Sequence, residues 1–173
     1  MDVNSRSHPV DPKLFRRVMG RFATGVTVIT AAASGETHGM TANAFMSGSL
    51  EPPLCVVSVA KRAHMHAFMS KSDRFAVNIL AEGQERVADH FAGKTKSKNG
   101  TAFATVDGIP VLAEASARIL ADTVASHDCG DHTLFIGHIR AMSTDDRPPL
   151  VYHAARFGAF EPHGADGSAP DIW

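Results

Sequence analysis

A shortage of cysteine and the lack of any long apolar run limit what this chain can be. Its 173 residues include two cysteines, Cys55 and Cys129, too few for a disulfide scaffold or a four-cysteine zinc site. No apolar run approaches the roughly 20 residues that a membrane-spanning helix needs. The opening residues MDVNSRSHPV also lack the apolar segment of a signal peptide. We therefore expect a cytoplasmic protein that does not enter a membrane.

An excess of basic charge and the common cofactor motifs are also missing. Lys and Arg total 17 against 18 Asp and Glu, so binding to nucleic acid is not expected. The sequence contains no G-x-G-x-x-G, no G-x-x-x-x-G-K-[ST], no G-x-S-x-G and no H-E-x-x-H. These absences argue against a Rossmann site, a P-loop, a hydrolase nucleophile elbow and a zinc protease. Any cofactor would have to be held by another fold.

What is present is a succession of short strands with few helices. Asp11 and Pro12 are typical of a helix start, and the apolar residues that follow lie on one face at helical spacing. The segments GVTVIT and THGMTANAF, separated by a turn, predict a hairpin, and LCVVSVA at 54–60 predicts a strand buried on both faces. Strand mostly follows strand, which favours one domain over residues 1–173. We expect an antiparallel sheet closed into a small barrel, with helices packed outside and flexible tails at 1–9 and 162–173.

Four segments are candidates for binding a ligand. The first contains alternating small polar residues, and the second contains a pair of cationic residues. In the first, Thr41, Asn43 and Ser47 suit a polar planar ligand, but such alternation also fits a solvent-facing strand. In the second, Lys61 and Arg62 lie where a strand gives way to a short helix. This arrangement can bind phosphate, although a pair of charges is more often a solvated turn. The neighbouring H-x-H has no third ligand at a recognisable spacing, so we predict no metal site.

The other two candidate segments centre on Phe91 and His132. Phe91, near the end of a predicted helix, is by default a core residue, and the alternative is a helix end that covers a ligand. His132 follows a tight Gly130-Asp131 turn and begins a strand. A lone histidine there is more often structural than catalytic. His138, further along the same strand, is expected to be structural.

Taken in order, these segments resemble one family. The stretches FATGVTVIT, GMTANAF, EPPL, SVAKRAHMHAFM, FAVNIL, HFAG, GDHTLFIGHI and PLVYHAARFG are similar to the small flavin reductases that have an FMN-binding split barrel. Those proteins are reductase components of two-component flavin-dependent monooxygenases. The resemblance runs from about Leu14 to Phe160, which is most of the chain.

The resemblance implies a homodimeric split barrel that passes hydride from NADH, or NADPH, to FMN or FAD. The reduced flavin would then diffuse to a separate oxygenase. His132 in the GDH turn would meet the nicotinamide and is the one residue to which a catalytic role is assigned, as a binding and orienting group. The rival hypothesis is a non-catalytic flavin- or haem-binding split barrel, which would not need the GDH turn.

The resemblance also implies the flavin contacts. The expected cofactor-binding residues are Thr41, Ala42, Asn43, Ser47, Ser58, Val59, Ala60, Lys61, Arg62, Met65, Phe91, Ala92, Gly93, His132 and Phe157. Relatives often carry a small hydroxyl residue where this chain has Ala63 or Met65, so phosphate binding would rely more on backbone amides and on Lys61 and Arg62. Phe157 replaces a frequent tyrosine, so a hydrogen bond from that hydroxyl is absent.

Overall fold

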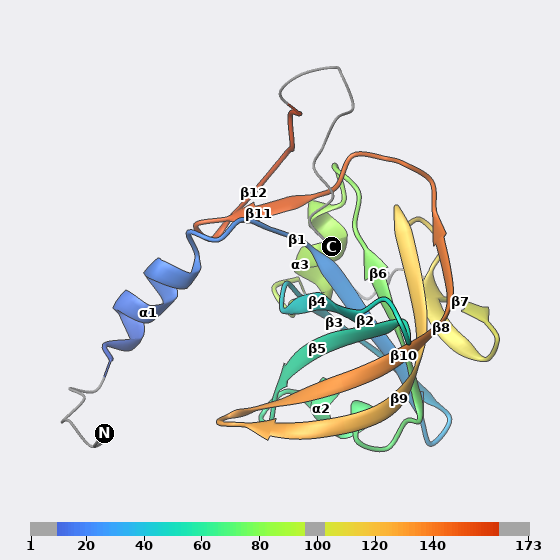
Figure 1. Cartoon of the computed structure of the whole chain (residues 1–173). Helices are drawn as coiled ribbons and strands as arrows, with labels where there is room; N and C mark the ends of the chain where they lie inside the picture. Colours follow the sequence, from blue (N-terminus) through green and yellow to red (C-terminus); the bar gives the residue numbers. More distant parts are fainter. Residues whose placement is uncertain (1–9, 96–102, 163–173) are drawn as a thin grey trace.

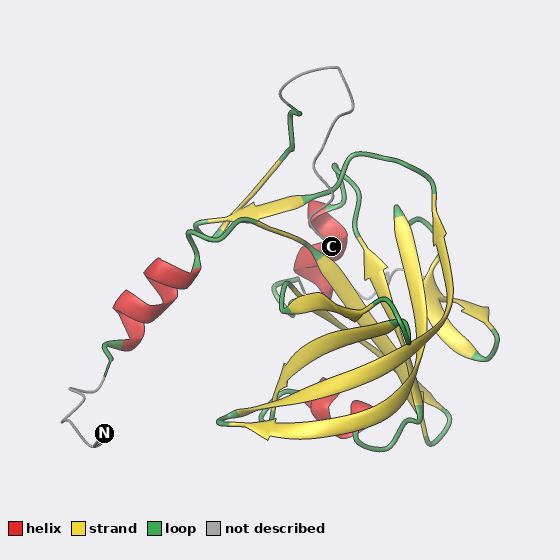
Figure 2. Ribbon diagram, viewed as in Figure 1, coloured by secondary structure: helices red, strands yellow, loops and turns green. Residues whose placement is uncertain are grey.

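The computed structural model describes residues 10–95 and 103–162, and these residues form mainly antiparallel sheet (Figure 2). The largest sheet has seven strands in the order β3-β2-β6-β9-β10-β5-β4. In chain order they are β2 (Thr27–Ala33), β3 (Glu36–Ala42), β4 (Phe45–Ser49), β5 (Leu54–Ala60), β6 (Arg74–Ile79), β9 (Ala117–Cys129) and β10 (His132–Thr144). The predicted tails lie outside the described residues, apart from Pro162.

The sheet curls around one core, and its two edges are consecutive strands (Figure 1). The predicted hairpin is confirmed as the β2–β3 pair, with Thr27 opposite Ala42. β3 and β4 follow one another along the chain but lie at opposite edges, which opens the barrel between them. The predicted antiparallel split barrel is therefore confirmed. A separate two-stranded sheet pairs β7 (Phe103–Val106) with β8 (Ile109–Leu112).

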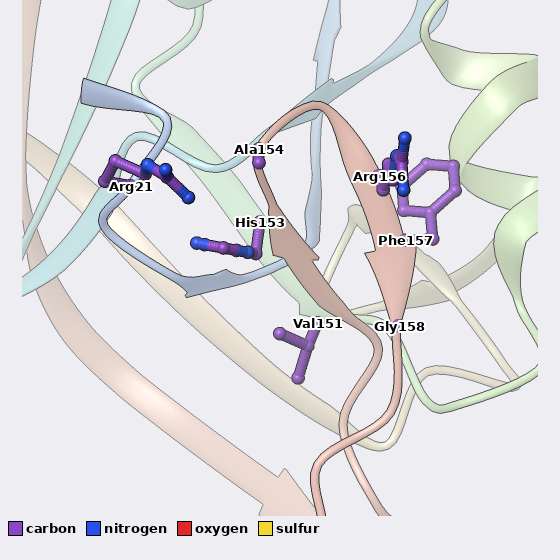
Figure 3. Close-up of a pocket in the computed structure, with 7 residues that line it drawn as sticks. All are labelled: Arg21, Val151, His153, Ala154, Arg156, Phe157 and Gly158. Carbon is purple, nitrogen blue, oxygen red and sulfur yellow. The ribbon is translucent and has the colours of Figure 1, made fainter. Parts of the chain in front are cut away.

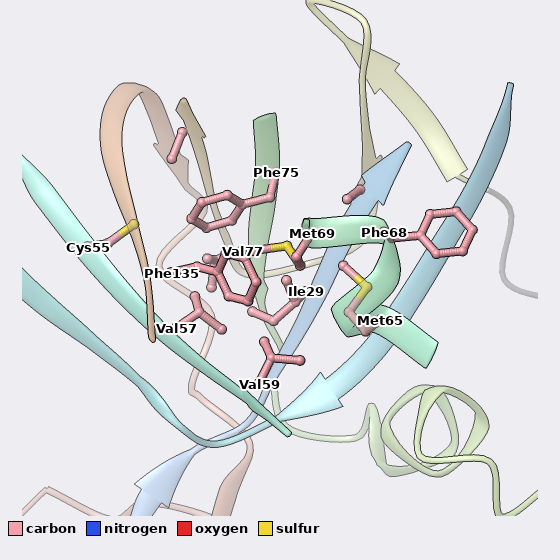
Figure 4. Close-up of a cluster of buried hydrophobic side chains, with 12 residues drawn as sticks. Ile29, Cys55, Val57, Val59, Met65, Phe68, Met69, Phe75, Val77 and Phe135 are labelled. Carbon is pink, nitrogen blue, oxygen red and sulfur yellow. The ribbon is translucent and has the colours of Figure 1, made fainter. Parts of the chain in front are cut away.

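The core lies inside the curled sheet (Figure 4). Phe75, Phe135 and Met65 are among its fully or almost fully buried side chains. β5 contributes alternate residues: Cys55, Val57 and Val59 are buried and the residues between them are half-buried. The prediction of a strand buried on both faces is therefore wrong, because β5 has the core on one side only.

Of the three helices in the described residues, two pack on the barrel. α2 (His64–Met69) buries Met65, Phe68 and Met69 against the core, and α3 (Glu85–Phe91) buries Ala88. None of the helices in the described ranges is long and apolar enough to span a bilayer.

The third helix, α1 (Pro12–Met19), forms as predicted but does not pack on the barrel. The Asp11 carboxylate accepts hydrogen bonds from the backbone N–H groups of Lys13 and Leu14, which fixes the first turn. The helix buries no residue and extends away from the barrel in Figure 1. The expectation of helices packed outside the barrel does not hold for α1, because its apolar face meets nothing within the described chain.

α1 continues into a small sheet. We call the helix and this sheet together the arm. This sheet has the order β1-β11-β12, formed by β1 (Thr24–Gly25), β11 (Val151–His153) and β12 (Arg156–Gly158). The backbone N–H of Ala154, in the β11–β12 turn, donates to the carbonyl of Gly20 at 2.8 Å. This bond and the β1–β11 pairing hold the end of α1 beside the β11–β12 hairpin.

Candidate functional site

Four segments from distant parts of the sequence meet at one small cavity, which we call the ring pocket. Its volume is about 180 Å³, and one wall belongs to the arm. The residues that line it are Val26, Thr41, Ala42, Asn43, Ala92, Lys94, Tyr152 and Phe157. Five of these eight were expected as cofactor contacts. Since small-molecule pockets usually measure roughly 300–1,000 Å³, the ring pocket can take part of a ligand and leave the rest outside.

Thr41 fixes the α3 side of the ring pocket. Its hydroxyl donates a hydrogen bond of 2.6 Å to the carbonyl of Ala88 in α3, so that proton is committed within the protein. The Thr41 oxygen can still accept a hydrogen bond from a ligand. Thr41 therefore positions α3 against the end of β3 as well as lining the cavity.

Phe91 packs against the buried cluster that includes Val26 and Ala88, and it is not among the residues that line the pocket. A Cβ atom at Gly39 would lie 2.7 Å from the Phe91 ring, and this ring stands 5.6 Å from that of Phe103. The glycine in β3 therefore makes room for Phe91. Of the two positions considered for Phe91, a core residue or a cover over a ligand, the structure has the core position. Gly93 follows with φ +73° and ends α3 outside the lining.

Lys94 and Tyr152 line the pocket but were missed in the sequence. The Lys94 ammonium lies 3.0 Å from an Asp89 carboxylate oxygen and 5.5 Å from the centre of the Phe157 ring. The hydrogen bond and charge of Asp89 raise the pKa of Lys94. Tyr152 faces Phe157 across the hairpin, with ring centres 5.6 Å apart. Tyr152 is the chain's one tyrosine, a signal that could have drawn attention to it.

A second group of expected residues gathers where β5 ends beside the β9–β10 turn. His132 pairs with Ala60, and the backbone N–H of Lys61 donates to the Asp131 carbonyl at 2.9 Å. The Lys61 ammonium also lies 3.3 Å from an Asp128 carboxylate oxygen. The turn that was expected to aim His132 therefore holds it next to the cationic end of β5.

His132 is paired with the acidic residue before it. Its Nδ1 lies 2.8 Å from an Asp131 carboxylate oxygen, and its side chain is 41% exposed. Hydrogen bonding to His132, and then its charge, lower the pKa of Asp131. The pair leaves the imidazole open to solvent, where it can meet a ligand.

The two groups lie along one stretch of the barrel surface. The carbonyl of Ala44, next to Asn43, accepts a hydrogen bond of 3.0 Å from the Ser58 backbone N–H. From Ser58 the strand advances about 7 Å to Ala60, beside His132. An elongated ligand anchored in the ring pocket can therefore continue across Asn43 and Ser58 toward His132.

Besides Phe91 and Gly93, three expected contacts lie outside both groups. Val59 and Met65 have no exposed surface and lie in the core, away from both groups. Met65 points inward because α2 rests on the barrel through this residue. Ser47 is exposed on the edge strand β4, opposite Cys55, and does not line the ring pocket.

The two histidines of the H-x-H motif turn in different directions. His64 stacks edge-on against His38, with ring centres 4.6 Å apart, whereas His66 Nε2 lies 2.9 Å from the Thr133 hydroxyl. Burial, and then the charge of His64, lower the pKa of His38. Within the described ranges no three His, Cys, Asp or Glu side chains come together as metal ligands.

Comparison with known proteins assigns the chain to a family. The model of the family described as "Flavin reductase like domain" matches residues 19–161. An NADH-dependent flavin reductase from Rhodococcus sp. is 41% identical over 160 residues, covering 91% of this chain and 91% of the relative. The reductase component of 4-hydroxyphenylacetate 3-monooxygenase from Thermus thermophilus is 40% identical over 139 residues, covering 80% of this chain and 89% of the relative.

A solved structure agrees with this assignment. The NADH:FAD oxidoreductase SgcE6 of Streptomyces globisporus, in complex with NAD and FAD fragments, superimposes with a TM-score of 0.83 at 37% identity. The alignment covers 92% of this chain and all of that one. A family match over most of the sequence and a shared fold lead to the same result: this chain belongs to the flavin reductase like domain family.

Proposed function

We propose that this protein is an NAD(P)H:flavin oxidoreductase that reduces FMN or FAD and supplies the reduced flavin to a partner monooxygenase. The observation that carries the proposal is the 41% identity to an NADH-dependent flavin reductase over nine-tenths of both chains. NADH is the expected donor and NADPH the alternative. We also propose the cytoplasm as its location.

The ring pocket fits part of a flavin. Phe157, Tyr152 and Ala42 offer apolar and aromatic surface for a planar ring, and Asn43 offers an amide at the exposed edge. A bound flavin supplies the hydride-accepting chemistry, and the protein has to bind and orient it. No strong acid–base pair is required for this task, which agrees with the modest set of titratable groups nearby.

The cation of the ring pocket has an electrostatic role in this proposal. A flavin gains negative charge on reduction, and Lys94 is the cationic residue that lines the cavity. The ammonium lies over the Phe157 ring and beside Asp89. Thr41 supports this geometry indirectly by tying α3 to β3.

The second group is proposed to bind the nicotinamide and the phosphate end of the flavin. Ser58 and Ala60 are half-exposed on β5, and Lys61 and Arg62 provide positive charge at its end. His132 would contact the nicotinamide through its exposed imidazole, with Asp131 orienting the ring. His132 is a binding group here and not an obligate proton donor.

A homodimer completes the proposal, and the arm supports it. Apolar side chains of α1 that would normally be buried are exposed, including Phe15 at 55% and Val18 at 58%. The helix has eight residues, fewer than the roughly 12–15 at which isolated helices become marginally stable. A second copy that covers the apolar face of α1 would explain why the helix forms.

The proposed activity can be tested with the purified protein, a flavin and a reduced nicotinamide under air. NADH absorbance should fall continuously in the presence of FMN or FAD, and more slowly with NADPH. Parallel titrations with FMN and FAD would rank the two flavins. Absence of nicotinamide oxidation with every flavin would instead favour the non-catalytic flavin- or haem-binding protein.

A further inference from the structure

Lys61 has an ionic partner within the chain. Its ammonium lies 3.3 Å from a carboxylate oxygen of Asp128, near the end of β9. The side chain of Lys61 is 40% exposed and that of Asp128 is 80% exposed. An ion pair this open to water contributes little free energy and can exchange partners. A phosphate group that reaches Lys61 therefore competes with Asp128 for the same ammonium.

The backbones that carry these two side chains are tied to each other. The backbone N–H of Lys61 donates to the Asp131 carbonyl at 2.9 Å. Asp128 pairs with Thr133 across the β9–β10 hairpin, and Thr133 pairs in turn with Val59 of β5. These contacts keep the end of β5 beside the hairpin. An exchange of ionic partners at Lys61 therefore needs movement of side chains only.

Asp128 and His132 lie on opposite faces of the hairpin. His132 begins β10 and Thr133 follows it. Because successive residues of a strand point to opposite faces, Thr133 and its partner Asp128 lie on the face opposite to His132. On that face the Thr133 hydroxyl lies 2.9 Å from His66 Nε2 of α2, and Asp128 lines a cavity of about 320 Å³. The ion pair therefore draws the Lys61 ammonium toward α2 and away from the face that would meet the nicotinamide.

A second carboxylate of the hairpin acts on the other cation at the end of β5. Hydrogen bonding to His132, and then the charge of His132, lower the pKa of Asp131, and the charge of Arg62 lowers it by a smaller amount. The carboxylate of Asp131 is therefore within electrostatic reach of Arg62. Each of the two cations proposed for the flavin phosphate thus has an acidic neighbour in the hairpin.

The arm contains cations that lack such neighbours (Figure 3). Arg21, His153 and Arg156 line a cavity of about 450 Å³ beside the β11–β12 hairpin. In residues 10–95 and 103–162, neither arginine forms an ion pair with a carboxylate. Phe157, which follows Arg156 in β12, turns its ring to the ring pocket, so Arg156 points to the opposite face. Lys61 differs in having a carboxylate partner and a place in the proposed flavin site.

We propose that Asp128 competes with the flavin phosphate for Lys61 and so lowers the affinity of the protein for its flavin. When the phosphate binds, the Lys61 ammonium turns to it and the Asp128 carboxylate is left to water. Asp128 is a positioning residue, because it sets the affinity through Lys61. Lower affinity suits a flavin that has to leave after reduction. The inference rests on the proposed function, which places the phosphate beside Lys61 and Arg62 and has the reduced flavin released.

Calorimetric titration of the full chain with FMN measures this competition without turnover. Asp128→Asn keeps the size of the side chain and removes its charge. It should bind FMN about two- to fivefold more tightly than wild type at low ionic strength, where exposed charges are least screened. Asp128→Glu restores a carboxylate and should return the FMN affinity toward that of wild type. Riboflavin, which lacks phosphate, should bind wild type and Asp128→Asn equally.

Further variants show whether the effect passes through Lys61. In a Lys61→Gln background, Asp128→Asn should no longer tighten FMN binding. Asp122→Asn removes the same charge from β9, where Asp122 pairs with Arg140, and should leave FMN affinity unchanged. Arg156→Gln removes a cation of the arm and should also leave it unchanged. A gain that persists without Lys61, or that Asp122→Asn reproduces, would reduce the effect to net charge and overturn the competition.

Three other results would also overturn the proposal. The first is equal FMN affinity in wild type and Asp128→Asn, or no FMN binding by either. The second is an equal gain for riboflavin, because the phosphate would then play no part. The third is tighter binding of NADH with unchanged FMN affinity, which would assign the competing phosphate to the nicotinamide dinucleotide.

The same titrations separate this inference from the proposed function. FMN reduced with dithionite and titrated without oxygen should show the same gain in Asp128→Asn, because reduction does not change the phosphate. A gain limited to oxidised FMN would overturn the role in release of the reduced flavin. Tighter FMN binding by Asp128→Asn in a protein that oxidises no NADH would refute the reductase activity and leave the competition standing. Normal NADH oxidation with equal FMN affinities would do the reverse.

Discussion

Neighbouring side chains fill the space beside Gly137 in the barrel strand β10, whereas the space beside Gly158 in the arm strand β12 is open. A Cβ atom at Gly137 would lie 2.6 Å from the Phe75 ring, and one at Gly158 would meet nothing. Apolar side chains follow the same division: Phe75 and Phe135 are buried in the barrel, while Phe15 is exposed on α1. The barrel buries its large apolar side chains within one chain, whereas those of α1 are left exposed, as a face that meets a second copy would be.

The largest expected effect is the difference in unfolding free energy between substitutions at two asparagines, Asn78 inside the barrel and Asn43 on its surface. Asn78 is fully buried; its amide donates to the Val28 carbonyl and the Thr30 hydroxyl and accepts from the Leu112 backbone N–H. Asn78→Ala removes three buried hydrogen bonds and leaves the Leu112 N–H without its acceptor, and it should lower the free energy of unfolding by about 3 kcal/mol. Asn43→Ala, at an exposed position, should change it by less than about 0.5 kcal/mol. Urea denaturation measures both, and equal losses would contradict the comparison.

Paired glycine substitutions give the next largest effect. Gly137→Ala forces a methyl group against Phe75 and Ala121 and should cost about 1–3 kcal/mol of stability. Gly158→Ala adds the same methyl group in open space and should stay within about 0.5 kcal/mol of wild type. Thermal unfolding of the two variants provides the measurement. A larger loss for Gly158→Ala would show that the arm is packed within the single chain.

The apolar face of α1 should affect association more than folding. Phe15→Asp combined with Val18→Asp places charges on the face proposed to meet a second copy, and should weaken the dimer about tenfold or more. The solvent-facing variant Lys13→Asp on the same helix is the control. Sedimentation velocity across a concentration series measures the change. If the double variant sediments as wild type does, α1 is not the dimer contact.

The smallest expected effect on stability concerns the exposed Asp131–His132 pair at the β9–β10 turn. His132 lowers the pKa of Asp131 from its ordinary value of 3.8, so the folded state favours the carboxylate. The associated stability is present above this value and is lost as pH falls through the lowered pKa. His132→Ala should return the Asp131 pKa toward 3.8 in an NMR titration, with little change in stability because the pair is exposed. An unchanged Asp131 titration would show that the two side chains do not interact in solution.

The same variant examines the proposed role of His132 in binding. His132→Ala should raise the apparent KM for NADH more than it changes flavin affinity, since the imidazole is proposed to contact the nicotinamide. Steady-state kinetics and flavin titration measure the two quantities separately. An unchanged KM with weaker flavin binding would assign His132 to the flavin instead.

Local signals made parts of the fold predictable. Asp11 and Pro12 indicated the start of α1 because a side-chain cap and a missing N–H act within one turn. The alternating residues of β2 and β3 and the short turn between them indicated the hairpin, because these signals are local as well. Neither signal shows what a face packs against, so the exposure of α1 and the one-sided burial of β5 could not be read from periodicity.

The site was less predictable because it is assembled from distant segments. Thr41, Ala42 and Asn43 were found because they are neighbours in one motif, but Lys94 and Tyr152 join them only through folding. The burial of Met65 was not foreseen, because a motif position does not reveal whether a side chain points into the core.

Reduction of a flavin by NADH in the absence of oxygen tests the central claim most directly. One equivalent of NADH is mixed anaerobically with the protein and one equivalent of FMN or FAD, and both chromophores are followed. The account predicts that flavin absorbance bleaches as an equal amount of NADH is oxidised, faster than without protein. Flavin that stays oxidised with the protein present, at the rate of the protein-free mixture, would contradict it.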